Sequence, residues 1–307
     1  MFERVLVPLD GSGLAESVLP LLEPILKRAD TEVLVLQVAQ YPAVPGTAAY
    51  VPLVEFEAAA REYVKRVAAE LTARGIRARG LVRVGPSAVG ILEAAEEERV
   101  SLVALTTHGR TGLVRWLMGS VAEKVIRSCP APALVFRSFP KARSRSASLV
   151  NAESLAPDRI LVPVDGSENS LGVVPGAIAL ARLFSAHVTI LRVHEPGETV
   201  DAAIPVDRAG GPRPPERTGA RPYGEVSVQR ALRLFMDAGV AAELVETEGD
   251  PGSRILETAD RAGAKLIALA THGRTGPTRW LLGSVAEKVL RASDLPVLVV
   301  RSPGLKP

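Results

Sequence analysis

The sequence predicts an α/β fold made of two tandem domains, each with a parallel sheet and helices on both of its faces. The first observation is a repeat: THGRTGLVRWLMGSVAEKVIR at 107–127 returns at 271–291 with four of 21 positions changed, and RVLVPLDGS at 4–12 returns as RILVPVDGS at 159–167. The second is that short apolar runs alternate with longer helical ones, as in βαβ units. The third is that these runs are continuously apolar, which is typical of strands covered on both faces. We therefore interpret the chain as a tandem duplication.

Five strands are expected in the first half, separated by turn residues. The first apolar run stops at Asp10-Gly11-Ser12, and Gly85-Pro86-Ser87 follows the third. The expected strands are Val5–Leu9, Glu32–Val38, Ala78–Val84, Ser101–Thr106 and Ala133–Arg137. The second half repeats them near residues 159–164, 187–193, 241–247, 265–270 and 296–301.

Helices are expected between these strands. One runs from the first turn to about Arg28, and another from about Val54 to Arg74, where apolar residues recur at helical spacing and Gly75 supplies a stop. Two more run from residue 87 to about Glu98 and from Ser120 to Ser128.

Prolines disturb the first of these helices. Pro20 and Pro24 lie inside it, and Pro175 is the equivalent of Pro20 in the second half. Because a proline in a helix interior costs about 3 kcal/mol, we expect a helix that is kinked or that starts late.

The repeat and the composition suggest where the domains divide. We expect a first domain at residues 1–138, a polar linker at 139–156 and a second domain at 157–303. A stretch rich in Pro, Gly and Arg interrupts the second half at about 195–222, where the first half has only the loop 41–52. Long segments of this kind are usually lids or disordered, so we interpret it as a mobile insertion.

Composition and charge limit the possible classes of protein. The chain has 307 residues, 37 basic and 34 acidic, with a net charge of +3. This near balance argues against nucleic acid as a partner, because the one basic cluster, Lys141, Arg143 and Arg145, lies in the linker and is interpreted as solvated. No apolar run reaches the roughly 18–20 residues of a membrane span, so no membrane partner is expected.

The single cysteine and the N-terminal sequence suggest a cytoplasmic location. Cys129 excludes an intrachain disulfide, and a reducing compartment is consistent with that. We interpret Cys129 as a buried, inert thiol rather than a nucleophile. The sequence MFERVLVPLD begins directly with a strand pattern and resembles no signal peptide.

The repeated segment carries the clearest chemical signal. A small polar cluster, Thr107-His108-Gly109-Arg110-Thr111-Gly112, follows a buried strand, and Gly119-Ser120 follows at the expected start of a helix. In open parallel sheets, ligands bind at the carboxyl ends of the strands. Glycine allows close approach of the backbone, and a helix N-terminus offers free N–H groups to an anion. The segment therefore predicts a phosphate site in each half.

The same residues have structural interpretations that the sequence leaves open. Ser120 with Glu123, and Ser284 with Glu287, fit a capping box as well as a ligand contact. Asp10 and Asp165 end the first strand of each half, where they contact either the base or sugar of a nucleotide or the local amides of an Asp-Gly turn.

The histidines of the repeat are weak catalytic candidates. His108 and His272 fit positioning or packing better than general-base catalysis, because a triad needs contacts that the sequence does not establish. The chain has no G-x-x-x-x-G-K-[ST] phosphate loop, no G-x-G-x-x-G after the first strand, and no Cys/His cluster typical of zinc.

These motifs resemble the universal stress protein family. That family has a nucleotide motif of G-x-x-G, nine residues, then G-[ST]. Gly109 is followed by RTGLVRWLM and Gly119-Ser120, and Gly273 by RTGPTRWLL and Gly283-Ser284. The first glycine of the motif is replaced by Thr106 and Ala270. The segments VLVPLDGS and ILVPVDGS also match, and the resemblance covers nearly the whole chain apart from the linkers.

The resemblance implies a nucleotide-binding, adenine-nucleotide alpha hydrolase-like fold, with a five-stranded parallel sheet in each domain. It implies ATP at the strand ends, accompanied by Mg²⁺. The family's pattern assigns the first site to Pro8, Asp10, Val38, Thr106, Gly109, Arg110, Gly119, Ser120 and Val121. It assigns the second site to Pro163, Asp165, Val193, Ala270, Gly273, Arg274, Gly283, Ser284 and Val285. Family members usually dimerise through the last strand, so the two halves are expected to form this dimer within one chain, with a further homodimer left open.

Three functional hypotheses follow. The leading one is an ATP-binding stress or regulatory protein with two sites and little or no turnover. The alternatives are a slow ATPase or nucleotidyl-transfer enzyme, which would use His108 with Ser120 and His272 with Ser284, and a nucleotide-independent protein-interaction module whose partner is unknown. Because Pro277 replaces Leu113, we expect the two sites to differ in affinity.

Overall fold

The computed structural model describes residues 2–40, 53–107, 118–137, 156–194, 223–271 and 282–301. Within them the expected alternation of strands and helices is confirmed, and the strand ends agree with the sequence prediction to within one or two residues. The first half contains β1 (Arg4–Pro8), α1 (Gly13–Glu16), α2 (Val18–Arg28), β2 (Glu32–Ala39), α3 (Leu53–Ala73), β3 (Arg77–Val84), α4 (Ser87–Glu97), β4 (Leu102–Thr106), α5 (Ser120–Ser128) and β5 (Ala133–Phe136).

The second half repeats this order. It contains β6 (Arg159–Pro163), the 3₁₀-helix η2 (Ser170–Val173), α6 (Val174–Phe184), β7 (His187–His194), α7 (Tyr223–Asp237), β8 (Ala242–Glu248), α8 (Pro251–Arg261), β9 (Leu266–Ala270), α9 (Ser284–Ala292) and β10 (Val297–Val300). The predicted insertion at 195–222 and the linker at 139–156 fall almost wholly outside the described residues.

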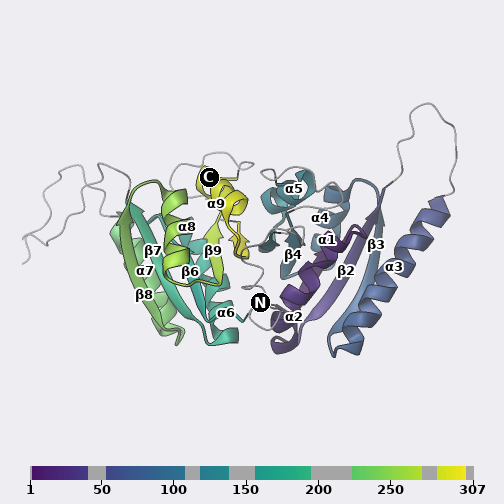
Figure 1. Ribbon diagram of the computed structural model, residues 1–307, viewed down its shortest axis with the longest axis horizontal. Helices are drawn as coiled ribbons and strands as arrows, with labels where there is room; N and C mark the ends of the chain where they lie inside the picture. The colour runs from purple at the N-terminus through teal and green to yellow at the C-terminus, as the bar shows by residue number, and fades with distance from the viewer. Residues whose placement is uncertain are drawn as a thin grey trace, which may run out of the picture.

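One ten-stranded sheet runs through both halves (Figure 1). Its order is β3-β2-β1-β4-β5-β10-β9-β6-β7-β8, and the strands within each half are parallel, as predicted. The halves meet where β5 pairs with β10 in the antiparallel direction, with Leu134 opposite Leu298. This is the intrachain pairing through the last strand that the resemblance implies.

Two apolar layers cover the sheet. One contains residues of α2, α3, α6 and α7, and the other contains residues of α4, α5, α8 and α9. The six strands β1, β4, β5, β6, β9 and β10 are almost wholly buried. The outermost strands differ, because no residue of β3 or β8 is fully buried. The expectation of strands covered on both faces is therefore wrong for β3 and β8. Each of them is an edge strand of the described sheet, with a neighbouring strand on one side only.

The prolines act as predicted. The first helical stretch is divided at Ser17, so that α2 starts late with Pro20 in its first turn, and α6 begins with Pro175 at its second position. A proline in the first turn loses no hydrogen bond, because that N–H has no acceptor in the helix. Pro24 lies inside α2 and leaves the carbonyl of Pro20 without its usual partner.

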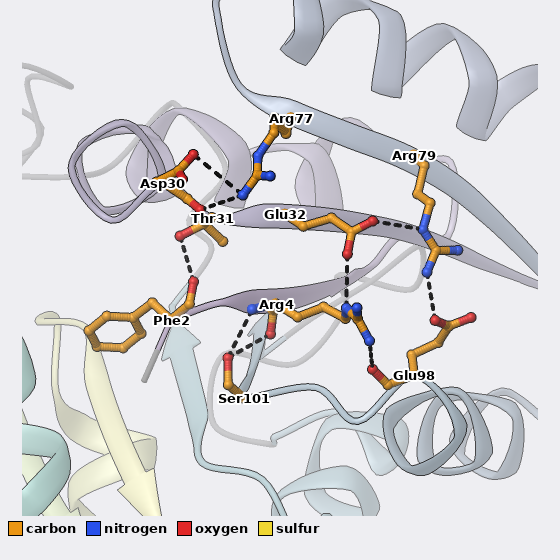
Figure 2. A network of polar contacts seen from close by, with 9 residues as sticks. All are labelled: Phe2, Arg4, Asp30, Thr31, Glu32, Arg77, Arg79, Glu98 and Ser101. Atoms are coloured by element: carbon orange, nitrogen blue, oxygen red, sulfur yellow. Dashed lines mark hydrogen bonds and ion pairs between the residues drawn. The ribbon is translucent and has the colours of Figure 1, made fainter.

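A network of ion pairs ties the amino ends of β1, β2 and β3 together (Figure 2). The carboxylate of Glu32 on β2 accepts hydrogen bonds from Arg4 Nε at 2.9 Å and from Arg79 Nε at 3.0 Å. Arg79 also donates to Glu98 Oε2 at 2.6 Å, and Arg4 donates to the carbonyl of Glu98. Ser101 Oγ accepts from the N–H of Arg4 at 3.1 Å. The carboxylate of Glu32 thus joins three neighbouring strands, and Glu98, the C-cap of α4, binds the same two arginines.

The amino ends of β6, β7 and β8 in the second half carry a different arrangement of charges. Arg159 is the equivalent of Arg4, but His187 stands where Glu32 stands and Glu243 stands where Arg79 stands. Arg159 therefore reaches across to the outer strand, and its Nη1 lies 2.9 Å from Glu243 Oε1. The acidic group has moved from the second strand to the edge.

Glu32→Gln tests how much this network stabilises the fold. The hydrogen bond from Arg79 is the main cause that lowers the pKa of Glu32 below its ordinary value of 4.5. Since the pKa is lower in the folded state, the stabilisation is present above that ordinary value and is lost as pH falls through the folded pKa. We expect Glu32→Gln to reduce the free energy of unfolding at pH 7 by about 1 kcal/mol and to flatten the acid side of the pH–stability curve.

Urea unfolding at a series of pH values measures both effects. Glu93→Gln is the matched control, because Glu93 is exposed on α4 and has no ion pair among the described residues. Equal curves for the two variants would show that the network adds nothing.

Candidate functional site

A cavity of about 860 Å³ lies at the carboxyl ends of β1, β2 and β4 in the first half. The chain runs from β1 outward to β2 and β3, and then returns to β4 on the other side of β1, so the strand order reverses between β1 and β4. The loops after these strands diverge there, which leaves a crevice suited to a ligand. Helices α3, α4 and α5 complete its walls.

The cavity collects seven residues that the sequence assigned to the first site. They come from three strand ends and one helix start, and they are Pro8, Asp10, Val38, Thr106, Gly119, Ser120 and Val121. His108, Gly109 and Arg110 lie outside the described residues, as do His272, Gly273, Arg274 and Pro277 in the second half.

The second half builds the same backbone frame. Leu9 N–H donates to the carbonyl of Leu36 at 2.8 Å, and Val164 N–H donates to that of Leu191 at 2.9 Å. Pro163 therefore ends β6 as Pro8 ends β1, Val193 lies on β7, and Ala270 ends β9. Gly283, Ser284 and Val285 begin α9, in the places of Gly119, Ser120 and Val121.

The start of α5 differs from the capping box that the sequence allowed. Gly119 is the N-cap and Ser120 is the first helical residue, and no side chain caps the helix. The N–H of Glu123 donates to the carbonyl of Gly119 at 2.9 Å, while the carboxylate of Glu123 pairs with Arg127. The same holds for Gly283, Glu287 and Arg291 in α9. The capping-box interpretation is wrong because the serine lies one residue too far along the helix.

The N-terminus of α5 is fixed to the strand edge by its backbone. Gly119 N–H donates to the carbonyl of Thr107 at 2.8 Å, and Gly283 N–H donates to that of Thr271 at 2.9 Å. The first N–H groups of α5 have no acceptor within the helix. Because residues 119 to 122 all line the cavity, these donors lie at its wall.

Asp10 and Asp165 make the local turn that the sequence offered as an alternative. Asp10 Oδ1 accepts from Ser12 N–H at 2.9 Å and from Ser12 Oγ at 2.6 Å. Asp165 Oδ1 accepts from Ser167 at 2.9 and 2.7 Å in the same way. These bonds hold the carboxylates at the strand ends, and Asp10 lines the cavity in that position.

Sequence reasoning missed several residues of the cavity wall. Gln37, Gln40, Tyr63 and Ser87 all line it, and Gln40 Nε2 donates to Ser87 Oγ at 2.7 Å. Gln37 Oε1 is buried and accepts no hydrogen bond from the residues that the structure describes. The signal was present in EVLVLQVA, where glutamine is the single polar residue between apolar ones. Almost none of the surface of Gln37 Oε1 is accessible, so this oxygen is closed off from a ligand in the cavity.

Tyr63 gives the cavity an aromatic wall on α3. Its hydroxyl donates to Glu16 Oε1 at 2.9 Å. Burial is the main cause that raises the pKa of Tyr63, followed by its hydrogen bond to Glu16. Tyr63 therefore remains a neutral hydrogen-bond donor at physiological pH.

The equivalent positions of the second half carry other side chains. Arg192 replaces Gln37, His194 replaces Ala39, Ser227 replaces Tyr63 and Pro251 replaces Ser87. Arg192 Nη1 lies 3.8 Å from Glu246 Oε1, and its Nε is buried without an acceptor. The two halves thus share a backbone frame but present a neutral acceptor in one case and a cation in the other.

The described residues contain no cluster of three or more His, Cys, Asp or Glu side chains that could hold a metal ion. Cys129 is buried as predicted, and burial raises the pKa of its thiol, which keeps it protonated. Within the part of the chain that the structure describes, no helix is both long enough and apolar enough to cross a membrane.

Comparison with known proteins gives a consistent result. The model of the Universal stress protein family matches residues 1–137 and 157–301. Universal stress protein MJ0531 of Methanocaldococcus jannaschii is 33% identical over 153 residues, which cover 50% of this chain and 86% of that protein. Universal stress protein YxiE of Bacillus subtilis is 30% identical over 150 residues, which cover 47% of this chain and 99% of that protein.

The fold has a close counterpart of similar length. The crystal structure of a universal stress protein from Archaeoglobus fulgidus superimposes with a TM-score of 0.70 at 22% identity, covering 99% of both chains. The whole tandem arrangement therefore matches in fold.

Gly119→Ala tests the close contact between α5 and the strand edge. A Cβ at residue 119 would lie 2.9 Å from the carbonyl oxygen of Thr107, which belongs to the backbone and cannot rotate away. We expect the free energy of unfolding to fall by about 1–3 kcal/mol. Gly13→Ala is the matched control, since nothing lies within 4 Å of a Cβ there. Thermal unfolding of the two variants measures the difference, and equal melting temperatures would contradict the contact.

Proposed function

Because this chain belongs to the universal stress protein family, we propose that it is a stress or regulatory protein that binds ATP at two sites with little or no turnover. The proposal includes a cytoplasmic location and a division into domains at 1–138 and 157–303 joined by a linker. The observation that carries it is the cavity at the strand-order reversal, whose wall combines the first N–H groups of α5 with an apolar end.

The phosphate end of the proposed site is the start of α5. The N–H groups of Ser120, Val121 and Ala122 have no acceptor within the helix and line the cavity. The positive end of the helix dipole favours an anion at the same place. Mg²⁺ would arrive with the triphosphate, since the described residues alone form no metal cluster and Asp10 is the carboxylate in the wall.

The base end of the proposed site is apolar. Val38, Ile91 and Leu105 offer surface for a flat ring, and a volume of about 860 Å³ is within the usual range for small-molecule sites. Gln37 lies on the opposite face of β2 from these three residues, so its side chain is not part of the base end.

Isothermal titration calorimetry with ATP and Mg²⁺ tests the proposal directly. We expect binding at micromolar to millimolar ATP, with unequal affinities because Gln37 and Arg192 differ in charge. The absence of any binding at millimolar ATP would overturn the proposal.

Ser120→Ala separates ligand contact from helix stability. Since Ser120 is exposed and its side chain caps nothing, the substitution should leave the free energy of unfolding within about 0.5 kcal/mol of the original. Affinity for ATP at the first site should fall by a factor of about five, through loss of one hydroxyl contact to phosphate. A large loss of stability with unchanged affinity would instead show that this serine serves the helix.

A further inference from the structure

The two outer strands of the sheet carry opposite charges. β3 bears Arg77, Arg79 and Arg83, whereas β8 bears Glu243, Glu246 and Glu248. The two strands lie at opposite ends of the molecule (Figure 1), and none of the described residues forms a strand on their outer sides. Each therefore presents an unpaired backbone edge flanked by charges of one sign.

The opposite charges arise at equivalent positions. Arg79 is the equivalent of Glu243, Val82 of Glu246, and Val84 of Glu248. In the first half the acidic residue of the ion-pair network is Glu32 on β2, and it pairs with Arg79 on β3. In the second half the acidic residue is Glu243 on the edge strand β8, at the position equivalent to Arg79. The duplication has thus given two similar edges of opposite sign.

A groove follows the basic edge. It has a volume of about 630 Å³ and is lined by Arg61 and Lys65 of α3 and by Arg79 and Arg83 of β3. Its floor includes Gly80, where a Cβ would lie 2.5 Å from Val64 Cγ2, so the helix approaches the strand closely. The groove is therefore bounded by four cationic side chains along a free strand edge.

Part of this charge is already neutralised within the chain. Arg79 pairs with Glu32 and Glu98, Arg83 with Glu97, and Arg61 with Glu57. At the other edge Glu243 pairs with Arg159 and Glu246 lies near Arg192. Lys65 and Glu248 are exposed and have no ion pair among the described residues. These two carry the charge that remains for a partner.

We propose that the acidic edge strand β8 of a second copy of this chain docks on β3 and continues the sheet from one molecule to the next. Backbone hydrogen bonds between the two edges would supply the attraction, as in strand addition generally. Lys65 and Arg61 lie on the same side of the sheet as Glu246 and Glu248 of the incoming strand. Arg79 and Arg83 lie on the side of its Glu243.

The geometry of the sheet sets the direction of this contact. The strands of the two halves run in opposite directions, as the antiparallel pairing of β5 and β10 requires. A second copy whose helical layers stay on the same faces therefore brings its β8 alongside β3 in the antiparallel direction. This repeats at the molecular boundary the relation that already joins the two halves.

Charge selects this contact over the other two possible ones. Pairing of β3 with β3 would place arginines opposite arginines, and pairing of β8 with β8 would place glutamates opposite glutamates, which is unfavourable across strands. Charged residues on an edge strand block pairing with a like edge. Such charges do not block pairing with an edge of opposite sign. The remaining contact is the head-to-tail one between β3 of one copy and β8 of the next, and repeating it gives an open chain of molecules rather than a closed dimer.

Sedimentation velocity of the full chain over a wide range of concentration tests the proposal. In about 0.1 M salt we expect the mean mass to rise with concentration, and in about 1 M salt we expect it to fall back, since the screening length shortens from about 10 Å to about 3 Å. Lys65→Glu and Glu248→Lys should each weaken self-association by at least about tenfold. The control variants Arg261→Glu and Glu93→Lys reverse exposed charges on α8 and α4 and should associate as the original chain does.

Mixing the two edge variants gives the decisive measurement. The Lys65→Glu and Glu248→Lys chains each have one reversed edge, and every edge contact between the two unlike chains joins charges of opposite sign. The mixture should therefore regain the self-association that each variant alone has lost. A mixture that stays monomeric, edge variants that associate like the original chain, or an original chain that is monomeric throughout would each overturn the proposal. Binding of a synthetic acidic strand peptide by a chain that does not self-associate would also overturn it, in favour of a foreign partner.

Discussion

The backbone hydrogen bonds between β5 and β10 join two five-stranded sheets into one, and much else in the molecule depends on that junction. Three residues of each strand face each other in register, with Leu134 opposite Leu298, both almost fully buried. An edge strand of this length and apolar character would otherwise be exposed to pairing with other chains. The junction removes both apolar edges at once, and it leaves β3 and β8 as the only ends of the described sheet.

The same junction explains why duplicated sequences have diverged most toward the outside. The strands near the centre are almost wholly apolar in both halves, because they lie between two helical layers. At the outer strands the constraint is weaker, and Arg79 and Glu243 occupy equivalent places with opposite charge. Burial keeps the central strands of the two halves similar in sequence. Exposure to solvent allows the outer strands β3 and β8 to differ, so that one end of the sheet is basic and the other acidic.

The candidate sites show the same division between frame and lining. Hydrogen bonds such as Gly119 to Thr107 and Gly283 to Thr271 hold both helix starts at the strand edge with nearly the same lengths. The side chains that face the first cavity, including Gln37 and Tyr63, have no counterpart of like chemistry at Arg192 and Ser227. The same backbone frame therefore surrounds side chains of different chemistry in the two halves.

The sequence by itself determined the order of the elements, the strand ends and the late start of α2, because these depend on local periodicity, on proline and on turns such as Asp10-Gly11-Ser12. The resemblance of its motifs to the universal stress protein family also named seven residues that line the cavity. Only the tertiary structure decided that Gly119 rather than Ser120 is the N-cap, that Gln37 lies in the cavity wall, and that Arg79 and Glu243 mark opposite ends of one sheet. Those features depend on which distant segments meet and which atoms they cover, and a pattern of neighbours along the chain carries no information about either.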